Sequence, residues 1–403
     1  MAQGRPVVRI AHVTSSISRV GAGVSKVVRD LAEVQTGNTD TIHIYTLMDQ
    51  FTKIDQPHHD GITVTACPVT LSPRFGYSRP LQKSLNGYVS SIDVIHMHGL
   101  WMYPNWAAGN LARKSSIPYI MSPHGMLEPW GLDRGKWKKK VTGLLFEYKN
   151  LNNTHCLHAC SEQEAQNIRH FGYRGPIAHI PLGLTCDEFN IASIATYDHV
   201  VDIPQLRPYT DKKVILFLSR LHVKKGLEFL IEAWKTIESD FPDWHLVIAG
   251  DGDPDYITEL QRKVHVVGLA DSVTFTGAVH GDDKWGILKK ANIFVLPTYS
   301  ENFGLVVAEA LASGVPVITT KGTPWNDLEK HDCGWWIDIG AQPLEECLVK
   351  ALSLSDSQIA EMGKRGRRLV ESKYVINITA NKMRAVYEWM CNGGTVPDCV
   401  RLD

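Results

Sequence analysis

The sequence predicts an α/β protein built from two Rossmann-like, doubly wound domains that face each other across a cleft. Its 403 residues are too many for one ordinary hydrophobic core, which favours two domains of similar size. Short apolar runs typical of buried strands alternate with helical stretches through both halves of the chain. Several of these runs end in glycine-containing loops, and open parallel sheets bind their ligands at that edge.

The domain boundaries follow from a stretch without clear periodicity. Residues 191–210 include Pro204 and Pro208, and we expect the interdomain linker there. The prediction is therefore an N-terminal domain over residues 1–205 and a C-terminal domain over residues 206–375. From about Ile376 to residue 403, the apolar spacing indicates an amphipathic helix, and similar proteins return this helix to the N-terminal domain.

Composition and charge argue against several classes of protein. Lys and Arg total 42 against 43 Asp and Glu, so nothing indicates a nucleic-acid partner. The eight cysteines are scattered without the paired spacing of a zinc site, which favours reduced thiols and no metal. No apolar run has the length of a membrane span, and Arg5 leads directly into a short strand-like run instead of a signal core. We expect a cytoplasmic protein, either free or peripheral on the inner face of the membrane.

The first strand-like run, residues 7–13, leads into a glycine-containing turn and a helix. This order is typical of dinucleotide-binding proteins, but Lys26 stands where their third glycine would be, which argues against a nicotinamide cofactor. The turn, which contains Gly23, still lets the backbone approach a phosphate or an acceptor closely.

Two further strand-like runs end in histidines. Residues 93–99 include His98, and residues 118–125 include His124 between a proline and a glycine. In a parallel sheet, both imidazoles would lie at the ligand-binding edge. Each can equally be a structural histidine that is hydrogen-bonded at the end of its strand.

Residues 128–149 mix aromatic and basic side chains, among them Trp130, Arg134, Trp137 and the lysines at 136 and 138–140. A solvated, charged helix face is the ordinary explanation. The alternative is a surface within residues 130–140 that contacts anionic lipid head groups or an anionic acceptor, to which each basic residue can add about 1 kcal/mol.

The second half begins with the apolar run 213–218, and Arg220 and Lys225 follow it. Five positions apart across a strand-to-helix turn, these two cations would form a clamp at the carboxyl edge of the sheet. A nucleoside diphosphate gains negative charge as it leaves, so fixed cations would stabilise the transition state more than the ground state. Two solvated surface residues are the alternative.

Residues 299–310 read as a loop and a helix between two strand-like runs. In the loop, Glu301 offers a carboxylate and Asn302 an amide, and Gly304 lets the backbone approach a ligand. Glu309, inside the helix, can reach back toward the same edge because helical side chains tilt toward the N-terminus. The two carboxylates would then converge on one polyhydroxyl ligand, unless each is an ordinary surface acid.

This pattern resembles the signature of the retaining glycosyltransferases of family 4, which have the GT-B fold. The signature is a glutamate, a Phe-Gly pair, here Phe303 and Gly304, and a second glutamate followed by alanine. The resemblance covers nearly the whole chain and is most specific over residues 219–310. It implies a hexosyltransferase that uses neither a metal nor a cofactor and transfers a sugar with retention from a UDP- or GDP-linked donor to a sugar or lipid-linked acceptor. Polysaccharide or glycoconjugate biosynthesis is the usual setting of similar proteins.

The resemblance also implies roles for individual residues. Arg220 and Lys225 would bind the diphosphate, Glu309 the ribose, and Glu301 the sugar hydroxyls. In full, the implied catalytic residues are His124, Arg220, Lys225 and Glu301, the donor-binding residues are Gly23, Val279, Asn302, Phe303, Gly304, Leu305 and Glu309, and His98 lies on the acceptor side. The chain departs from the family pattern at two positions, since Ala22 replaces the first glycine of a Gly-Gly pair and Leu182 replaces an asparagine.

Three other functions fit a chain of this kind. A nucleotide-sugar epimerase or a phosphorylase of the same fold would use the same cleft, and the epimerase would need no acceptor. A catalytically silent GT-B binding protein would have no reason to keep Arg220, Lys225, Glu301 and Glu309 together. A nicotinamide-dependent dehydrogenase is disfavoured by the incomplete glycine fingerprint.

Overall fold

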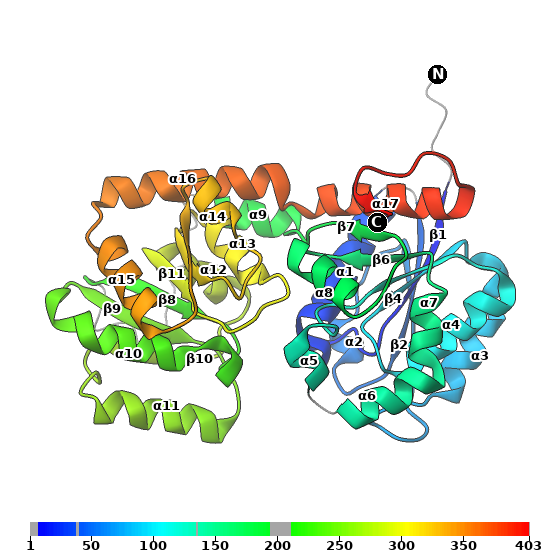
Figure 1. The fold of residues 1–403 in the computed structure, drawn as a ribbon, viewed down its shortest axis with the longest axis horizontal. Coiled ribbons are helices and arrows are strands. Elements are labelled where there is room, and N and C mark those ends of the chain that lie inside the picture. The colour runs from blue at the N-terminus through cyan, green and yellow to red at the C-terminus, as the bar shows by residue number, and fades with distance from the viewer. Residues whose placement is uncertain (1–6, 38–39, 134–135, 194–210, 403) are drawn as a thin grey trace. The chain divides into compact units, whose positions relative to one another are not determined.

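The computed structural model describes residues 7–37, 40–133, 136–193 and 211–402. Its contacts divide the chain into two compact units (Figure 1). Unit 1 comprises Met1–Leu182 and Ile376–Asp403, and unit 2 comprises Gly183–Val375. Each unit is built on one mainly or wholly parallel sheet with helices on its faces, so the predicted pair of Rossmann-like α/β domains is confirmed.

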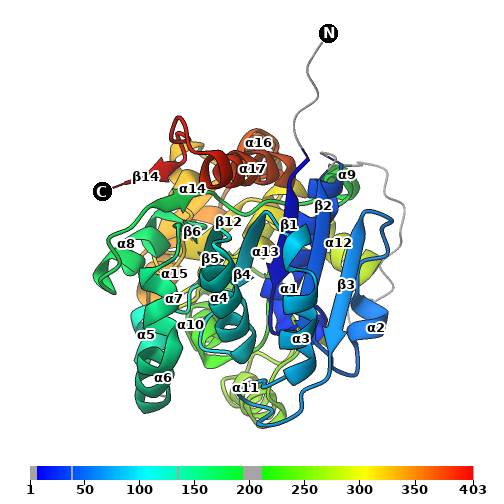
Figure 2. The same cartoon turned by 90° about the vertical axis from the view of Figure 1, so that its right-hand side faces the viewer.

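The sheet of unit 1 has eight strands in the order β14-β7-β6-β5-β4-β1-β2-β3. Neighbouring strands pair in parallel, except that the short β14 is antiparallel to β7. Figure 2 shows the strands from β3 to β6 side by side. The strand bounds are β1 Arg9–Val13, β2 Thr41–Leu47, β3 Ile62–Cys67, β4 Val94–His98, β5 Tyr119–Ser122, β6 Cys156–Ala159, β7 Ile177–His179 and β14 Val400–Arg401. The strand order reverses between β1 and β4, and open α/β sheets bind ligands at such a switch point.

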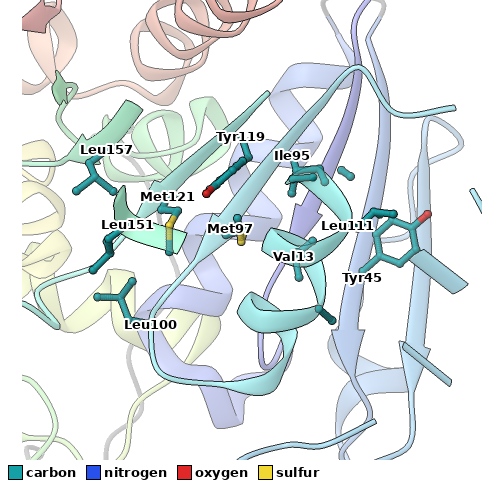
Figure 3. Packing of buried hydrophobic residues seen from close by; sticks show 14 of the residues in the cluster. Val13, Tyr45, Ile95, Met97, Leu100, Leu111, Tyr119, Met121, Leu151 and Leu157 are labelled. Carbon is teal, nitrogen blue, oxygen red and sulfur yellow. The ribbon is translucent and has the colours of Figure 1, made fainter. Parts of the chain in front are cut away.

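Side chains alternate between the two faces of this sheet because successive residues of a strand point in opposite directions. One face packs an apolar cluster, which includes Val13, Met97 and Met121, against residues of α4 and α7 (Figure 3). The other face packs residues such as Ile10 and Val94 against α1 and α17. The helices of unit 1 are α1 Ala22–Thr36, α2 Thr52–Asp55, α3 Arg79–Gly87, α4 Tyr103–Ser115, α5 Pro129–Asp133, α6 Lys136–Thr142, α7 Tyr148–Asn152, α8 Glu162–His170 and α17 Ile376–Asn392, and a π-helical turn, Gly143–Glu147, joins α6 to α7.

Unit 2 repeats the same plan with six parallel strands in the order β10-β9-β8-β11-β12-β13. Its switch point lies between β8 and β11. The strand bounds are β8 Lys213–Leu218, β9 Trp244–Ala249, β10 Val273–Gly277, β11 Ile293–Leu296, β12 Val317–Thr320 and β13 Gly334–Ile337. The helices are α9 Cys186–Ser193, α10 Leu227–Ile237, α11 Pro254–Val266, α12 Gly281–Lys290, α13 Leu305–Ala312, α14 Asp327–Lys330, α15 Ala341–Leu352 and α16 Asp356–Lys373.

The border between the units falls earlier in the chain than residue 205. Contacts place the border at Gly183 because α9 packs against α12 and α13 of unit 2. Most of the expected linker, residues 194–210, lies outside the described residues. The expected final helix is present as α17, and it belongs to unit 1, where it packs against α1.

A buried ion pair holds α17 on unit 1. Arg384 of α17 lies 2.6 Å from Oδ1 of Asp40, and the two side chains are 2% and 0% exposed. Asp40 also accepts a hydrogen bond from the backbone N–H of Val8 at 3.1 Å, while burial raises the pKa of its carboxyl. The pair therefore joins the last helix to the start of β1.

Replacing Arg384 with alanine is expected to lower the free energy of unfolding by about 3–5 kcal/mol, because Asp40 would remain buried without its partner. Urea denaturation measures this change. Arg401→Ala is the matched control, since Arg401 pairs at 2.7 Å with Glu162 on the surface and should contribute no more than about 1 kcal/mol. Equal losses in the two variants would contradict the anchoring role.

Candidate active site

The switch point of unit 2 brings together three of the predicted residues. Arg220 lies two residues beyond the end of β8, and Lys225 closes a 3₁₀ turn, Val223–Lys225, before α10. Nζ of Lys225 forms an ion pair with Oε2 of Glu301, which lies in the loop after β11. Arg220 is exposed and forms no ion pair with any described residue. Of the two predicted cations at this edge, Lys225 is therefore paired and Arg220 is exposed.

The two loops at this edge are fixed by backbone contacts that glycine permits. Gly226, the N-cap residue just before α10, has a φ of +69°, and a Cβ atom there would lie 2.0 Å from the carbonyl oxygen of Pro297. The carbonyl of Lys224 accepts hydrogen bonds from the N–H of Tyr299 and the hydroxyl of Thr298, each at 2.8 Å. These bonds set the position of Lys225 relative to Glu301.

The loop of Glu301 leads into α13 through a left-handed glycine. Gly304 has a φ of +80°, which favours glycine, and α13 begins at the half-buried Leu305. Phe303 is only 5% exposed, and its carbonyl accepts a hydrogen bond from Nε1 of Trp325 at 2.6 Å. The Phe303 ring is therefore buried beneath the loop. If this residue takes part in donor binding, it would do so through its backbone N–H. Asn302 is half-buried in the same loop.

The second predicted glutamate has a partner that sequence reasoning missed. Glu309 lies in α13 and is 3% exposed. Its Oε1 lies 2.6 Å from Nζ of Lys284, a residue of α12. No motif marks Lys284, which stands in an ordinary run of charged residues. Val279, also predicted at the donor site, lies two residues beyond β10 and is half-buried.

The switch point of unit 1 brings the two predicted histidines together. His98 ends β4, and His124 follows β5 in a loop where His124 and Gly125 have φ values of +51° and +77°. Nδ1 of His98 lies 3.1 Å from Nε2 of His124. Nε2 of His98 lies 3.0 Å from Nδ1 of His12, which stands near the end of β1 and was not predicted. Three imidazoles are thus connected by hydrogen bonds at one sheet edge.

A buried glutamate holds the His124 loop. Glu164, near the start of α8, accepts hydrogen bonds from the N–H of Gly125 at 2.7 Å and of Cys160 at 2.8 Å. The Ser161 side chain caps the same helix and accepts from the N–H of Glu164 at 3.1 Å. Burial raises the pKa of Glu164. The left-handed backbone of His124 is therefore held from the neighbouring strand–helix connection.

The glycine turn after β1 contains two glycines with different surroundings. Gly23 lies exposed in the first turn of α1, and a Cβ atom there would have no neighbour within 4 Å. At Gly21 a Cβ atom would lie 2.0 Å from Oγ of Ser25. A side chain at position 21 would therefore have to displace that of Ser25, whereas a role for Gly23 would depend on a ligand.

Burial lowers the pKa of every histidine near this edge. The pKa is about 4 for His12 and about 3 for His124, and that of His98 is well below its ordinary range. Nearby imidazoles reinforce the effect for His98 and His124. The imidazoles are therefore neutral near pH 7, and they can donate or accept hydrogen bonds without carrying charge.

Two Rossmann-type units with polar side chains at the switch point of each sheet are typical of GT-B proteins. Two family models match the chain, the model of glycosyltransferase family 4 over residues 21–188 and the model of glycosyl transferases group 1 over residues 201–369. Together they cover most of the chain. The protein therefore belongs to the group 1, family 4 glycosyltransferases of the GT-B fold.

Individual relatives agree with this assignment. An uncharacterized glycosyltransferase of Methanocaldococcus jannaschii is 29% identical over 62% of this chain and 63% of its own length. The D-inositol 3-phosphate glycosyltransferase of Mycolicibacterium smegmatis is 26% identical over 63% of this chain and 60% of its own length. A putative glycosyltransferase of Bacillus subtilis, 31% identical over 44% of this chain, is matched over 46% of its length. The chain thus spans about half to two thirds of the curated relatives that it matches.

Solved structures show the same fold at low sequence identity. The structure of Anabaena HepE in complex with UDP and glucose has a TM-score of 0.74 and 17% identity, over 94% of this chain and 99% of that chain. Sucrose-phosphate synthase from Thermosynechococcus elongatus has a TM-score of 0.72 and 21% identity, over 96% of this chain and 100% of that chain.

Proposed function

We propose that the protein transfers a hexose from a nucleotide-sugar donor to a sugar or lipid-linked acceptor in polysaccharide or glycoconjugate synthesis, with retention and without a metal or cofactor. The observation that carries the proposal is the charge arrangement at the switch point of unit 2. Exposed Arg220 and the pair of Lys225 with Glu301 lie in the two loops that flank this switch point. Cations and a carboxylate at this edge suit a ligand with both a diphosphate and sugar hydroxyls.

The chemistry follows from where charge develops. In the proposed reaction, the bond between the anomeric carbon and the diphosphate oxygen breaks, and the acceptor oxygen bonds to that carbon on the same face. The proton of the acceptor hydroxyl passes to the departing phosphate oxygen. Arg220 and Lys225 would stabilise the charge on that phosphate, the task that a divalent ion performs in other enzymes. Glu301 would orient the sugar hydroxyls and Glu309 the ribose.

Named relatives support two donor classes. The HepE complex contains UDP and glucose, and a mycobacterial relative that is 28% identical over 53% of this chain is a GDP-mannose-dependent mannosyltransferase. We therefore propose a UDP- or GDP-linked donor.

A thermal-shift screen in the presence of a chelator tests the proposal against UDP, GDP, ADP and their sugar conjugates. A nucleotide at a hundred times its Kd should add about 2.7 kcal/mol, which moves the midpoint by a few degrees. Arg220→Ala should lose the shift, whereas Arg262→Ala, an exposed arginine on α11, should keep it. Absence of any shift would count against the donor site, and turnover of donor without acceptor would favour the epimerase.

A second observation favours contact with a membrane surface. Four apolar side chains are exposed on α6 and the π-helical turn, namely Trp137 at 69%, Val141 at 47%, and Leu144 and Leu145 at 72% each. Their spacing places them on one side of a helix, and two exposed lysines lie nearby in the sequence, Lys140 on α6 and Lys149 on α7. We call these four apolar residues the α6 face. The arrangement suits a helix that lies in the interface of an anionic membrane.

The α6 face extends the predicted segment 130–140 toward the π-helical turn. Of the predicted residues, Arg134 lies outside the described residues, and the side chains of Trp130, Lys136 and Lys138 are not described. Lys139 donates a hydrogen bond to the carbonyl of Gly131 and so contributes less to the surface. Among the described residues, no helix combines the length and the apolar character that a bilayer crossing requires.

Sedimentation with phosphatidylcholine vesicles, with and without phosphatidylserine, measures this contact. We expect binding that needs phosphatidylserine and falls with salt. The double change Leu144→Gln and Leu145→Gln should weaken it by about tenfold or more, because two exposed apolar side chains are lost. Val266→Gln, at an equally exposed valine of α11, is the control. Equal binding by both variants would contradict the role of the α6 face.

A further inference from the structure

A layer of buried polar residues crosses four adjacent strands of unit 1, on the sheet face that α1 and α17 cover. Its members are no more than 3% exposed, and they are His12 of β1, His96 and His98 of β4, Ser122 of β5 and His158 of β6. Strand register brings them together, since His12 pairs with His96 and His98 with Ser122. Gln35 of α1 and Tyr387 of α17 complete the layer from above the sheet. Of these groups, only His98 has a role that the family resemblance implies.

The hydrogen bonds of this layer have a direction, because one end is a backbone carbonyl that can only accept. Nε2 of His158 lies 2.8 Å from the carbonyl oxygen of Ile180, so Nε2 carries the proton. Nδ1 of the neutral His158 ring then accepts from the hydroxyl of Ser122 at 2.8 Å. Because that hydroxyl has donated its proton, Ser122 accepts from Nε2 of His96 at 2.6 Å.

The same rule continues through the two covering helices. With Nε2 of His96 protonated, its Nδ1 accepts from the hydroxyl of Tyr387 at 2.7 Å. Tyr387 in turn accepts from the side-chain amide of Gln35 at 3.4 Å. The amide oxygen of Gln35 then accepts from Nε2 of His12 at 2.8 Å. Tyr387 and Gln35 are both fully buried, so water does not compete for these groups.

The last two bonds lead to His124. Nδ1 of His12 accepts from Nε2 of His98 at 3.0 Å, and Nδ1 of His98 accepts from Nε2 of His124 at 3.1 Å. Each ring remains neutral along this path because burial lowers the pKa of all five histidines. Nδ1 of His124 makes no hydrogen bond with any described residue, and it is left with a lone pair.

We infer that this histidine chain fixes His124 as the Nε2–H tautomer, so that His124 offers a ligand a hydrogen-bond acceptor at Nδ1. The inference rests on the proposed function for the identity of the ligand, which would be a donor-sugar hydroxyl. Ser122, Gln35 and Tyr387 then act as positioning residues, since they act on the ligand only through His124. A hydroxyl that donates to Nδ1 is bound, whereas a fluorine in its place cannot donate and is rejected.

A metal ion is the competing explanation for part of the layer. The ring nitrogens of His12, His96 and His98 lie within 4.8 Å of one another. Both nitrogens of each ring already take part in the hydrogen bonds described above. An ion would have to break several of these bonds inside a buried layer, so the hydrogen-bonded chain explains the contacts better.

Two-bond ¹H–¹⁵N NMR spectra of the full chain, labelled at histidine, report the tautomer directly near pH 7. We expect all five histidines of this hydrogen-bonded series to be Nε2–H tautomers. Their spectra should not change when a chelator is added. An Nδ1–H tautomer or an imidazolium at His124 would overturn the inference, as would metal-dependent signals from His12, His96 and His98. This measurement needs no ligand, so it decides the inference even if the protein transfers no sugar.

Tyr387→Phe tests the link through α17. It removes the hydroxyl that links His96 to Gln35 in the series of hydrogen bonds. His124 should therefore change from one tautomer to a mixture of two. Tyr45→Phe is the matched control, since it removes a buried hydroxyl that lies 3.1 Å from Nδ1 of His43, outside the chain. If Tyr387→Phe does not fold, Gln35→Met breaks the same link from α1. An unchanged His124 tautomer in the folded variant would contradict the link.

Binding of donor analogues gives a second readout. In deoxyfluoro derivatives of UDP-glucose and GDP-mannose, replacement of the hydroxyl that meets His124 should weaken binding by about tenfold to a hundredfold. Tyr387→Phe should reduce this discrimination, because an Nδ1–H tautomer tolerates fluorine, whereas Tyr45→Phe should preserve it. Discrimination that is equal in wild type and Tyr387→Phe would contradict the positioning role.

Discussion

Acidification from about pH 7 to about pH 5 is expected to remove several kcal/mol from the free energy of unfolding, chiefly through the buried histidines of unit 1. In the unfolded chain a histidine takes up a proton near its ordinary pKa of 6.5. In the folded protein the pKa is about 4 for His12 and His158 and about 3 for His124, and it is well below 6.5 for His96 and His98.

The sign follows from proton counting. As the pH falls below 6.5, the unfolded state binds protons that the folded state does not, so stability falls with pH. Each histidine contributes up to about 1.4 kcal/mol per pH unit until its folded pKa is reached. Glu147 offsets part of this loss, because burial raises its pKa to about 7 and its carboxyl therefore takes up a proton in the folded state over this pH range.

Urea denaturation at several pH values between about 7.5 and 5.5 measures the slope. His158→Gln should flatten the slope by about one proton, because the amide can replace both hydrogen bonds of the ring without titrating. His265→Gln, at an exposed histidine of α11, should leave the slope unchanged. Stability that stays constant over this range would contradict the burial of neutral imidazoles.

The sequence allowed prediction of the features that follow from sheet topology. Alternating strands and helices imply parallel sheets, and parallel sheets collect the loops after their strands at one edge. The placement of Arg220, Lys225 and Glu301 in the two loops at one switch point therefore followed from pattern alone, as did the meeting of His98 and His124. What these residues bind does not follow from the same pattern.

Features that depend on register or on helix packing were not predictable in this way. Lys284 meets Glu309 because α12 and α13 are neighbours, and an ordinary lysine in a charged run gives no signal of this contact. His96 and His98 stand two residues apart in a strand, which does predict a shared face. The pairing of His12 with His96 in neighbouring strands and the hydrogen bond from Tyr387 to His96 could be seen only in the three-dimensional structure. Likewise, the exposure of Leu144 and Leu145 could not be inferred from the basic and aromatic residues before them.

Lys225→Met is expected to reduce kcat/KM for sugar transfer by about a hundredfold to a thousandfold. Such losses are typical when one preorganised group that stabilises transition-state charge is removed. Lys225 is 13% exposed and Glu301 22%, so their ion pair is shielded from screening by solvent. Removing the cation would also leave the Glu301 carboxylate to repel the diphosphate. Two effects of the same sign therefore act on the leaving diphosphate.

A double-mutant cycle separates these effects. Glu301→Gln should also lower kcat/KM, and the double variant should be far less impaired than the product of the two single losses, because each change already disrupts the same pair. Lys364→Met is the control, since Lys364 lies 3.4 Å from Glu361 on the exposed face of α16 and should stay near wild-type activity. Losses that multiply independently would mean that Lys225 and Glu301 contact the donor separately, and the ion pair would then have no part in arranging the site.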